Sequence, residues 1–236
     1  MAHEVYAFGD SHWRLFFPFT NHGSPGPRHE QDGIVTIDTT ANELSGATMW
    51  GLQRVDSTHR ARLRILNTID TAGGVDNVGL VFGEVDVRYH WTRYYKDGKL
   101  SVPAVLQLLT AYRRFIDEEL LSGRVRNKVF VYYGFRYNPG TPNQTHRDRI
   151  PTAEFVLDLH RLIEQLMPHV MSQSGGRIVT ITPCDELEGQ AGLLHPDFTD
   201  KDGIHPLPEQ IFPRFVFPVL KAHLNPDPPV MREIAL

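Results

Sequence analysis

The sequence is poor in cysteine and has no long apolar run. Cys184 is its one cysteine among 236 residues. A single cysteine excludes an internal disulfide framework and a cysteine-rich zinc site. No uninterrupted apolar stretch approaches the roughly 18 residues of a membrane span, and residues 1–15 carry acidic residues and histidines where a secretory signal would be apolar. We therefore expect a cytoplasmic protein with no membrane partner.

An excess of basic residues is also absent. Lysine and arginine number 24 against 28 aspartates and glutamates, which gives a net charge of −4 and argues against a nucleic-acid partner held by a basic face. No G-x-G-x-x-G motif follows the first predicted strand and no H-E-x-x-H motif occurs, so we expect neither a dinucleotide cofactor nor a metal. The remaining composition is that of an ordinary globular protein. It predicts one domain over residues 1–236, with a proline-rich tail from about residue 224.

The apolar pattern alternates between short runs and helical spacing. The short runs predict strands at residues 4–8, 34–38, 78–82, 129–133 and 178–181. Helical spacing follows over residues 58–71, 105–120 and 155–170, and again beyond residue 206. Such alternation predicts an α/β fold: a three-layer α/β/α sandwich around a flavodoxin-like, five-stranded parallel sheet. Ligands of such sheets bind beyond the carboxyl ends of the strands, so reactive residues are expected there.

The first reactive candidates follow residues 4–8. The chain reads Gly9-Asp10-Ser11-His12 at this point, and the glycine permits a sharp turn. Ser11 would then stand near a helix N-terminus, where free backbone N–H groups favour an anion. Asp10 or Ser11 acting only as a helix cap is the competing interpretation, and from these residues alone it is the better one.

A possible base for the serine stands near the end of the chain, in Asp202-Gly203-Ile204-His205. A serine hydroxyl needs a base to accept its proton before it becomes a good nucleophile. His205 is a candidate for that base, and Asp202 for the carboxylate that orients the imidazole. Gly46 follows the second predicted strand, where the lack of a side chain would let a backbone N–H approach a substrate oxygen.

In this order the three motifs resemble those of the SGNH (GDSL) hydrolase superfamily, and the resemblance extends from Gly9 to His205. It implies a flavodoxin-like fold and hydrolysis of esters without a metal. By this resemblance Ser11 is the nucleophile, His205 and Asp202 complete the triad, and the backbone N–H groups of Ser11 and Gly46 bind the oxyanion.

The sequence departs from the family pattern in the third motif. The family has G-x-N-D, whose asparagine is the third oxyanion donor, but residues 83–86 read GEVD and Val85 has no side-chain donor. Losing one oxyanion donor typically costs about 10²–10³ in rate. The enzyme could be slow, the domain could have kept the fold without the chemistry, or another side chain could replace the donor. The candidates for replacement are Arg88, Asn138 and Asn143. An ion pair of Arg88 with Glu84 or Asp86 is the simpler interpretation of that arginine.

Histidines and acids near these motifs leave a second arrangement open. A cation could be held by a set drawn from Asp10, His12, His90, Asp202 and His205. No compact ligand motif supports this, and the triad has the better chemical logic. We count Asp10, His12, Glu84, Asp86 and His90 as possible substrate or oxyanion support.

The expected activity is a serine-dependent hydrolase that releases an acyl group from a small or carbohydrate ester. Four aromatic residues within 89–95 would suit a sugar ring, although packing against the domain explains them equally well. Two alternatives remain: an O-acyltransferase that uses a sugar hydroxyl in place of water, and a non-catalytic domain that binds a carbohydrate or an anion.

Overall fold

The computed structural model describes residues 2–10, 13–17, 28–37, 44, 46–54, 56–57, 59–91, 101–135, 153–189, 195–198 and 206–225. Side chains are described within these ranges except at residues 13, 88–90, 153–156, 184–185 and 196. These ranges contain the greater part of all five strands that the sequence predicts.

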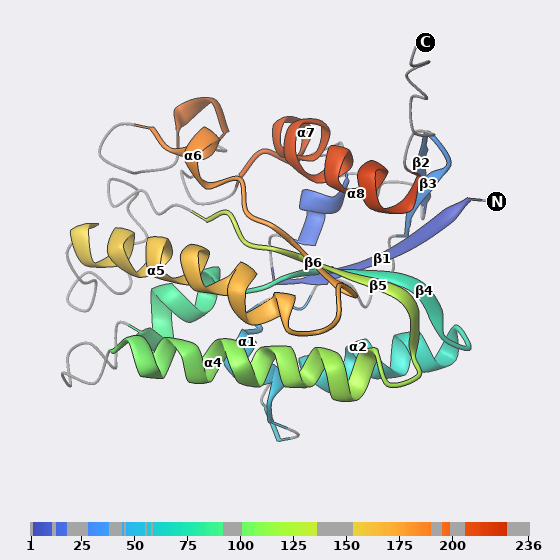
Figure 1. Cartoon of the computed structure of the whole chain (residues 1–236), viewed down its shortest axis with the longest axis horizontal. Helices are drawn as coiled ribbons and strands as arrows, with labels where there is room; N and C mark the ends of the chain where they lie inside the picture. Colours follow the sequence, from blue (N-terminus) through green and yellow to red (C-terminus); the bar gives the residue numbers. More distant parts are fainter. Residues whose placement is uncertain are drawn as a thin grey trace, which may run out of the picture.

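A twisted sheet of six strands forms the centre of the molecule (Figure 1). Its order is β2-β3-β1-β4-β5-β6, and all neighbours are parallel except β2 and β3. The strands are β1 (His3–Gly9), β2 (Arg28–Gln31), β3 (Ile34–Ile37), β4 (Val75–Val81), β5 (Val125–Tyr132) and β6 (Ile178–Ile181). The five parallel strands correspond to the five predicted ones and follow the flavodoxin-like order, which confirms the predicted fold class.

The prediction of five strands was one too few, because β2 forms an antiparallel edge beside β3. Its residues alternate between exposed and half-buried positions and are all polar, so no apolar run marked them. The missed signal is the connection, Asp32-Gly33. Both residues have positive φ angles, 48° and 75°, as the favoured two-residue turn between antiparallel strands requires.

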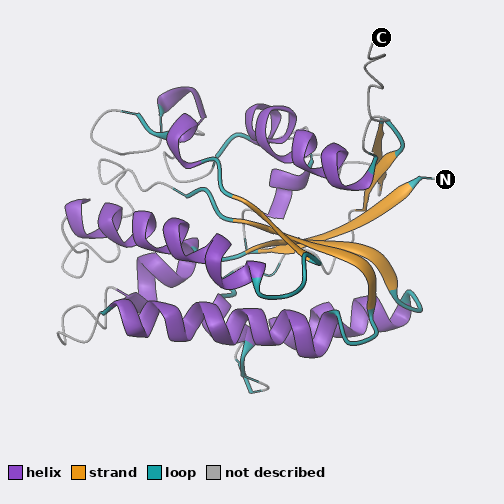
Figure 2. Cartoon of the chain, viewed as in Figure 1, coloured by secondary structure: helices purple, strands orange, loops and turns teal. Residues whose placement is uncertain are grey.

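Helices cover both faces of the sheet and complete the predicted three layers (Figure 2). One face carries α1, α2, α4 and α5, and the other carries α7, α8 and the short η1. The helical segments are η1 (Trp13–Phe16), α1 (Met49–Leu52), α2 (Ala61–Thr71), η2 (Asp86–Trp91), α4 (Val102–Phe115), η3 (Ile116–Leu120), α5 (Ala153–Ser172), α6 (Cys184–Leu187), η6 (Pro196–Phe198), α7 (Pro208–Ile211), η7 (Phe212–Val216) and α8 (Phe217–Leu224).

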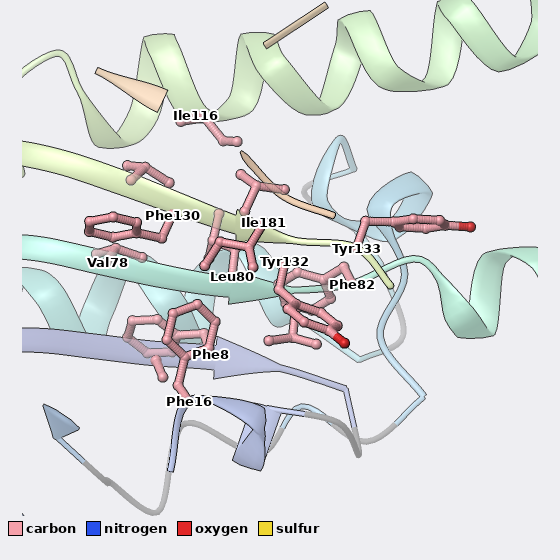
Figure 3. Packing of buried hydrophobic residues seen from close by; sticks show 14 of the residues in the cluster. Phe8, Phe16, Val78, Leu80, Phe82, Ile116, Phe130, Tyr132, Tyr133 and Ile181 are labelled. Atoms are coloured by element: carbon pink, nitrogen blue, oxygen red, sulfur yellow. The ribbon is translucent and has the colours of Figure 1, made fainter. Parts of the chain in front are cut away.

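The helical spacing in the sequence locates most of the core. In α4, Val105, Leu108 and Leu109 recur on one face and are buried, as expected. In α2, Leu66 and Ile69 are buried as their spacing predicts, together with Ile65, whereas Leu63 is 38% exposed. Apolar side chains fill both sides of the sheet, with Phe16 beneath it and Ile116 above it in the view of Figure 3.

Candidate functional site

Backbone hydrogen bonds join three of the segments that leave the carboxyl edge of the sheet. Leu44 N–H, beyond β3, donates to the carbonyl of Gly9 at the end of β1 (2.8 Å). Asp10 N–H donates in turn to the carbonyl of Val81 at the end of β4 (3.2 Å). The glycine of the second motif is therefore tethered next to the strand end that precedes Ser11.

Gly46 has a left-handed backbone conformation. Its φ is +73°, in the left-handed region that a residue without Cβ adopts readily. A tight turn surrounds it, because Ala47 N–H donates to the Leu44 carbonyl at 2.8 Å. Within the described part of the chain, the N–H of Gly46 has no hydrogen-bond acceptor. This half-buried donor is available to an oxygen of a ligand.

Asp86 binds the beginning of α1. Its carboxylate accepts hydrogen bonds from the N–H of Met49 at 2.7 Å and from that of Trp50 at 3.1 Å. The next N–H, on Gly51, donates to the hydroxyl of Thr48, which is the N-cap. The first three donors of this short helix are thus satisfied. Asp86 is fully buried, so its described contacts position α1 and the segment that carries Gly46.

Three acidic side chains are buried at this edge of the sheet: Asp10, Glu84 and Asp86. The pKa of Asp86 is raised to about 7, mainly because burial penalises its charged form; the two backbone N–H groups lower the pKa, and the charges of Asp10 and Glu84 raise it. Burial also raises the pKa of Tyr112, on α4, and the charges of Asp86 and Asp10 add to that rise. The region therefore favours a bound proton near neutral pH.

Val85, in the asparagine position of the third motif, is buried but not part of the main core. Its exposed fraction is 6%, yet it lies outside the contiguous cluster that includes its neighbours Phe82 and Val87. Val87 N–H donates to the Gly83 carbonyl at 3.1 Å, which begins the helical segment η2 directly after this position. The side chain of Val85 has no polar atom with which to replace the donor of the family motif.

Tyr133 and His160 form a buried polar pair that the motifs did not indicate. The Tyr133 hydroxyl and His160 Nδ1 are 2.9 Å apart, and neither residue is more than 2% exposed. The ring of Tyr133 lies against Gly83, where an added Cβ would come within 2.6 Å of it. Tyr132 and Tyr133 diverge from the end of β5 (Figure 3). The available signal was position alone, since Tyr133 closes a predicted strand.

Several predicted site residues lie outside the described part of the chain. They are Ser11, His12, Asn138, Asn143, Asp202 and His205, together with the side chains of Arg88 and His90. The described candidates are Asp10, Gly46, Glu84, Val85 and Asp86, all of which follow β1, β3 or β4. Trp91, one of the aromatic residues considered for sugar binding, is 5% exposed and belongs to the core.

Among the described residues, no group of three or more histidine, cysteine, aspartate or glutamate side chains is arranged to hold a metal ion. None of the helices in that part of the chain has the length and apolarity needed to cross a membrane.

No protein-family model matches the sequence, and no curated protein matches it. Solved structures, however, share its fold. A carbohydrate acetylesterase family member from Sinorhizobium meliloti has a TM-score of 0.58 and 12% sequence identity, over 94% of this chain and 99% of the other. The aryl esterase of M. smegmatis has a TM-score of 0.54 and 13% identity, over 89% and 94% of the two chains.

A third similar structure is a lipase whose name refers to the GDSL motif. It is a GDSL-like lipase from Bacteroides thetaiotaomicron, with a TM-score of 0.51 and 14% identity over 94% of this chain and 89% of the other. The chain has the same fold as these esterases and this lipase. This fold is the one that the three sequence motifs implied, and it accounts for the positions of Gly9, Gly46 and Gly83 at one edge of the sheet.

Proposed function

We propose that the protein is a serine esterase that removes an acyl group from a small or carbohydrate ester. The observation that carries the proposal is the N–H of Gly46, which has no acceptor among the described residues and is tethered through Leu44 to the carbonyl of Gly9. That bond brings the predicted oxyanion donor next to the strand end from which the predicted nucleophile, Ser11, follows. The esterases and the lipase of the same fold support the same class of reaction.

The proposed reaction uses an acyl-enzyme. Ser11 Oγ attacks the ester carbonyl while His205 accepts its proton, and Asp202 orients and stabilises the imidazolium. The carbonyl oxygen becomes an oxyanion held by the N–H groups of Ser11 and Gly46. The C–O bond of the ester then breaks, and His205 returns the proton to the departing alcohol. Water, deprotonated by His205, attacks the acyl-serine and releases the carboxylic acid with a free Ser11.

Labelling with a fluorophosphonate tests the proposal without knowledge of the substrate. We expect one adduct, located at Ser11 by peptide mapping, and loss of that adduct in Ser11→Ala and His205→Ala. Ser172→Ala is the matched control, because this exposed serine at the end of α5 lies on a helix outside the candidate site. Hydrolysis of p-nitrophenyl acetate should follow the same pattern. A folded wild-type protein with no adduct and no hydrolysis would refute the esterase.

A non-catalytic binding domain is the second candidate, and Val85 is the observation that favours it. This residue replaces the side-chain donor of the third motif, which an enzyme uses and a binding domain does not need. The labelling experiment separates the two, since a domain without an activated serine forms no adduct. An O-acyltransferase would label at Ser11 like the esterase. It would differ by transferring the acyl group to an added sugar hydroxyl faster than to water.

A further inference from the structure

The imidazole of His59 lies directly against Gly46. A Cβ built on Gly46 would be 2.9 Å from His59 Cε1 and 3.3 Å from Nε2, so only glycine leaves room for the ring. His59 itself is exposed. One side of the imidazole therefore covers the candidate oxyanion glycine, and the rest is accessible to a ligand.

A strained turn holds the imidazole there. Arg60, the next residue, has φ 48° and ψ 29°, a left-handed conformation that is unfavourable for a residue other than glycine. Its N–H donates to the carbonyl of Ser57 at 2.9 Å, and α2 begins immediately afterwards. Ser57 rests on α1, with its Oγ 3.1 Å from the Cβ position of Gly51. Such strain is common at functional sites, and here it fixes the residue beside Gly46.

His59 has an N–H donor of the kind that is missing at Val85. A neutral imidazole carries one N–H donor, and the ring nitrogens are within 3.6 Å of the Cβ position of Gly46. The ring therefore lies beside Cα of Gly46, the atom bonded to the N that would donate to the oxyanion. Val85 provides no donor to such an oxygen.

We propose that His59 is an oxyanion-binding residue, which donates a ring N–H to the same acyl oxygen as the Gly46 N–H. This inference rests on the proposed esterase function. His59 keeps its proton throughout, and no bond to it forms or breaks. It supplies in part the side-chain donor that the third motif has lost at Val85, so the ligand is the carbonyl oxygen of a small acyl ester.

Two substitutions distinguish hydrogen-bond donation by His59 from the packing of its ring against Gly46. His59→Phe keeps an aromatic ring over Gly46 without a donor, and His59→Gln keeps a donor without the ring. We expect His59→Phe to lower kcat for p-nitrophenyl acetate at least tenfold with little change in KM, because an oxyanion donor acts in the transition state. His59→Gln should retain several times more activity than His59→Phe. Both variants should unfold within a few degrees of the wild-type Tm.

The controls make the outcomes distinct. His169→Phe changes an exposed histidine near the end of α5 and should leave kcat unaltered. Adding Val85→Asn to His59→Phe should restore activity, because the asparagine amide replaces the lost donor. Unchanged kcat in His59→Phe, together with Ser11-dependent hydrolysis by the wild type, would overturn the role of His59 alone. Absence of Ser11-dependent hydrolysis in the wild type would overturn the esterase and this role with it.

Discussion

Asp86 and Met49 are joined by a 2.7 Å hydrogen bond between a buried carboxylate and a backbone N–H. The bond links the segment after β4 to the helix after β3, and so fixes the second and third motifs relative to each other. Gly46 precedes this helix by only a few residues, so the position of its N–H depends on the carboxylate of Asp86. The sequence predicted a different role for Asp86, the support of the substrate or the oxyanion.

Asp86 should make the stability of the protein depend on pH. Its folded-state pKa of about 7 lies above the unfolded value near 3.9. Between these values the folded state binds a proton that the unfolded state does not, so stability falls as pH rises and the contribution is lost above pH 7. The difference of about three pKa units corresponds to roughly 4 kcal/mol. In urea unfolding at pH 4 to 8, Asp86→Asn should gain stability relative to the wild type by up to that amount. A difference between the two proteins that does not change with pH would contradict this.

Gly46→Ala should abolish most of the esterase activity. The added Cβ meets the His59 ring at 2.9 Å in a backbone conformation that already disfavours alanine, so the N–H and the ring must both move. We expect kcat to fall at least a hundredfold. Gly73→Ala is the matched control, with φ +71° and no atom within 4 Å of its Cβ position. It should lose about 1 kcal/mol of stability and no activity. Equal activity in the two variants would show that the surroundings of Gly46 are unimportant.

Val85→Asn should raise the rate of ester hydrolysis, by about tenfold or more, because it returns an amide donor to the third motif. The gain should be larger in the presence of His59→Phe than in the wild type. Val85→Leu changes the volume at the same position without adding a donor and should produce no gain. Steady-state kinetics with p-nitrophenyl acetate compare the wild type, the three single variants and the double variant. A folded Val85→Asn protein no faster than the wild type would mean that this position does not face the oxyanion.

Tyr133→Phe should destabilise the protein by about 1–3 kcal/mol, since it removes the hydroxyl from the buried pair with His160. The adjacent Tyr132→Phe is the comparison. The Tyr132 hydroxyl donates to the Gly134 carbonyl over a long 3.4 Å, so its loss should cost less. Urea unfolding of both variants gives the two values. A smaller loss for Tyr133→Phe than for Tyr132→Phe would assign little stability to the Tyr133–His160 contact.

The apolar pattern of the sequence was enough to predict the three layers and the edge of the sheet at which the motifs lie. Buried parallel strands appear in the sequence as continuous apolar runs, and helices appear as apolar residues repeated every three to four positions. The polar strand Arg28–Gln31 left none, and was missed, because an edge strand is half exposed and its position depends on the turn at Asp32-Gly33. The glycines of the site were found because they belong to short motifs that follow one another in a characteristic order along the chain.

The side chains that surround those glycines could not be predicted from the sequence and are known from the tertiary structure alone. His59 lies beside Gly46 from the turn before α2, Asp86 reaches α1 from the start of η2, and His160 reaches Tyr133 from α5. Each contact joins different segments of the chain, and neither His59 nor His160 lies in a motif. Their proximity follows from the packing of strands and helices, which periodicity in a single segment does not encode.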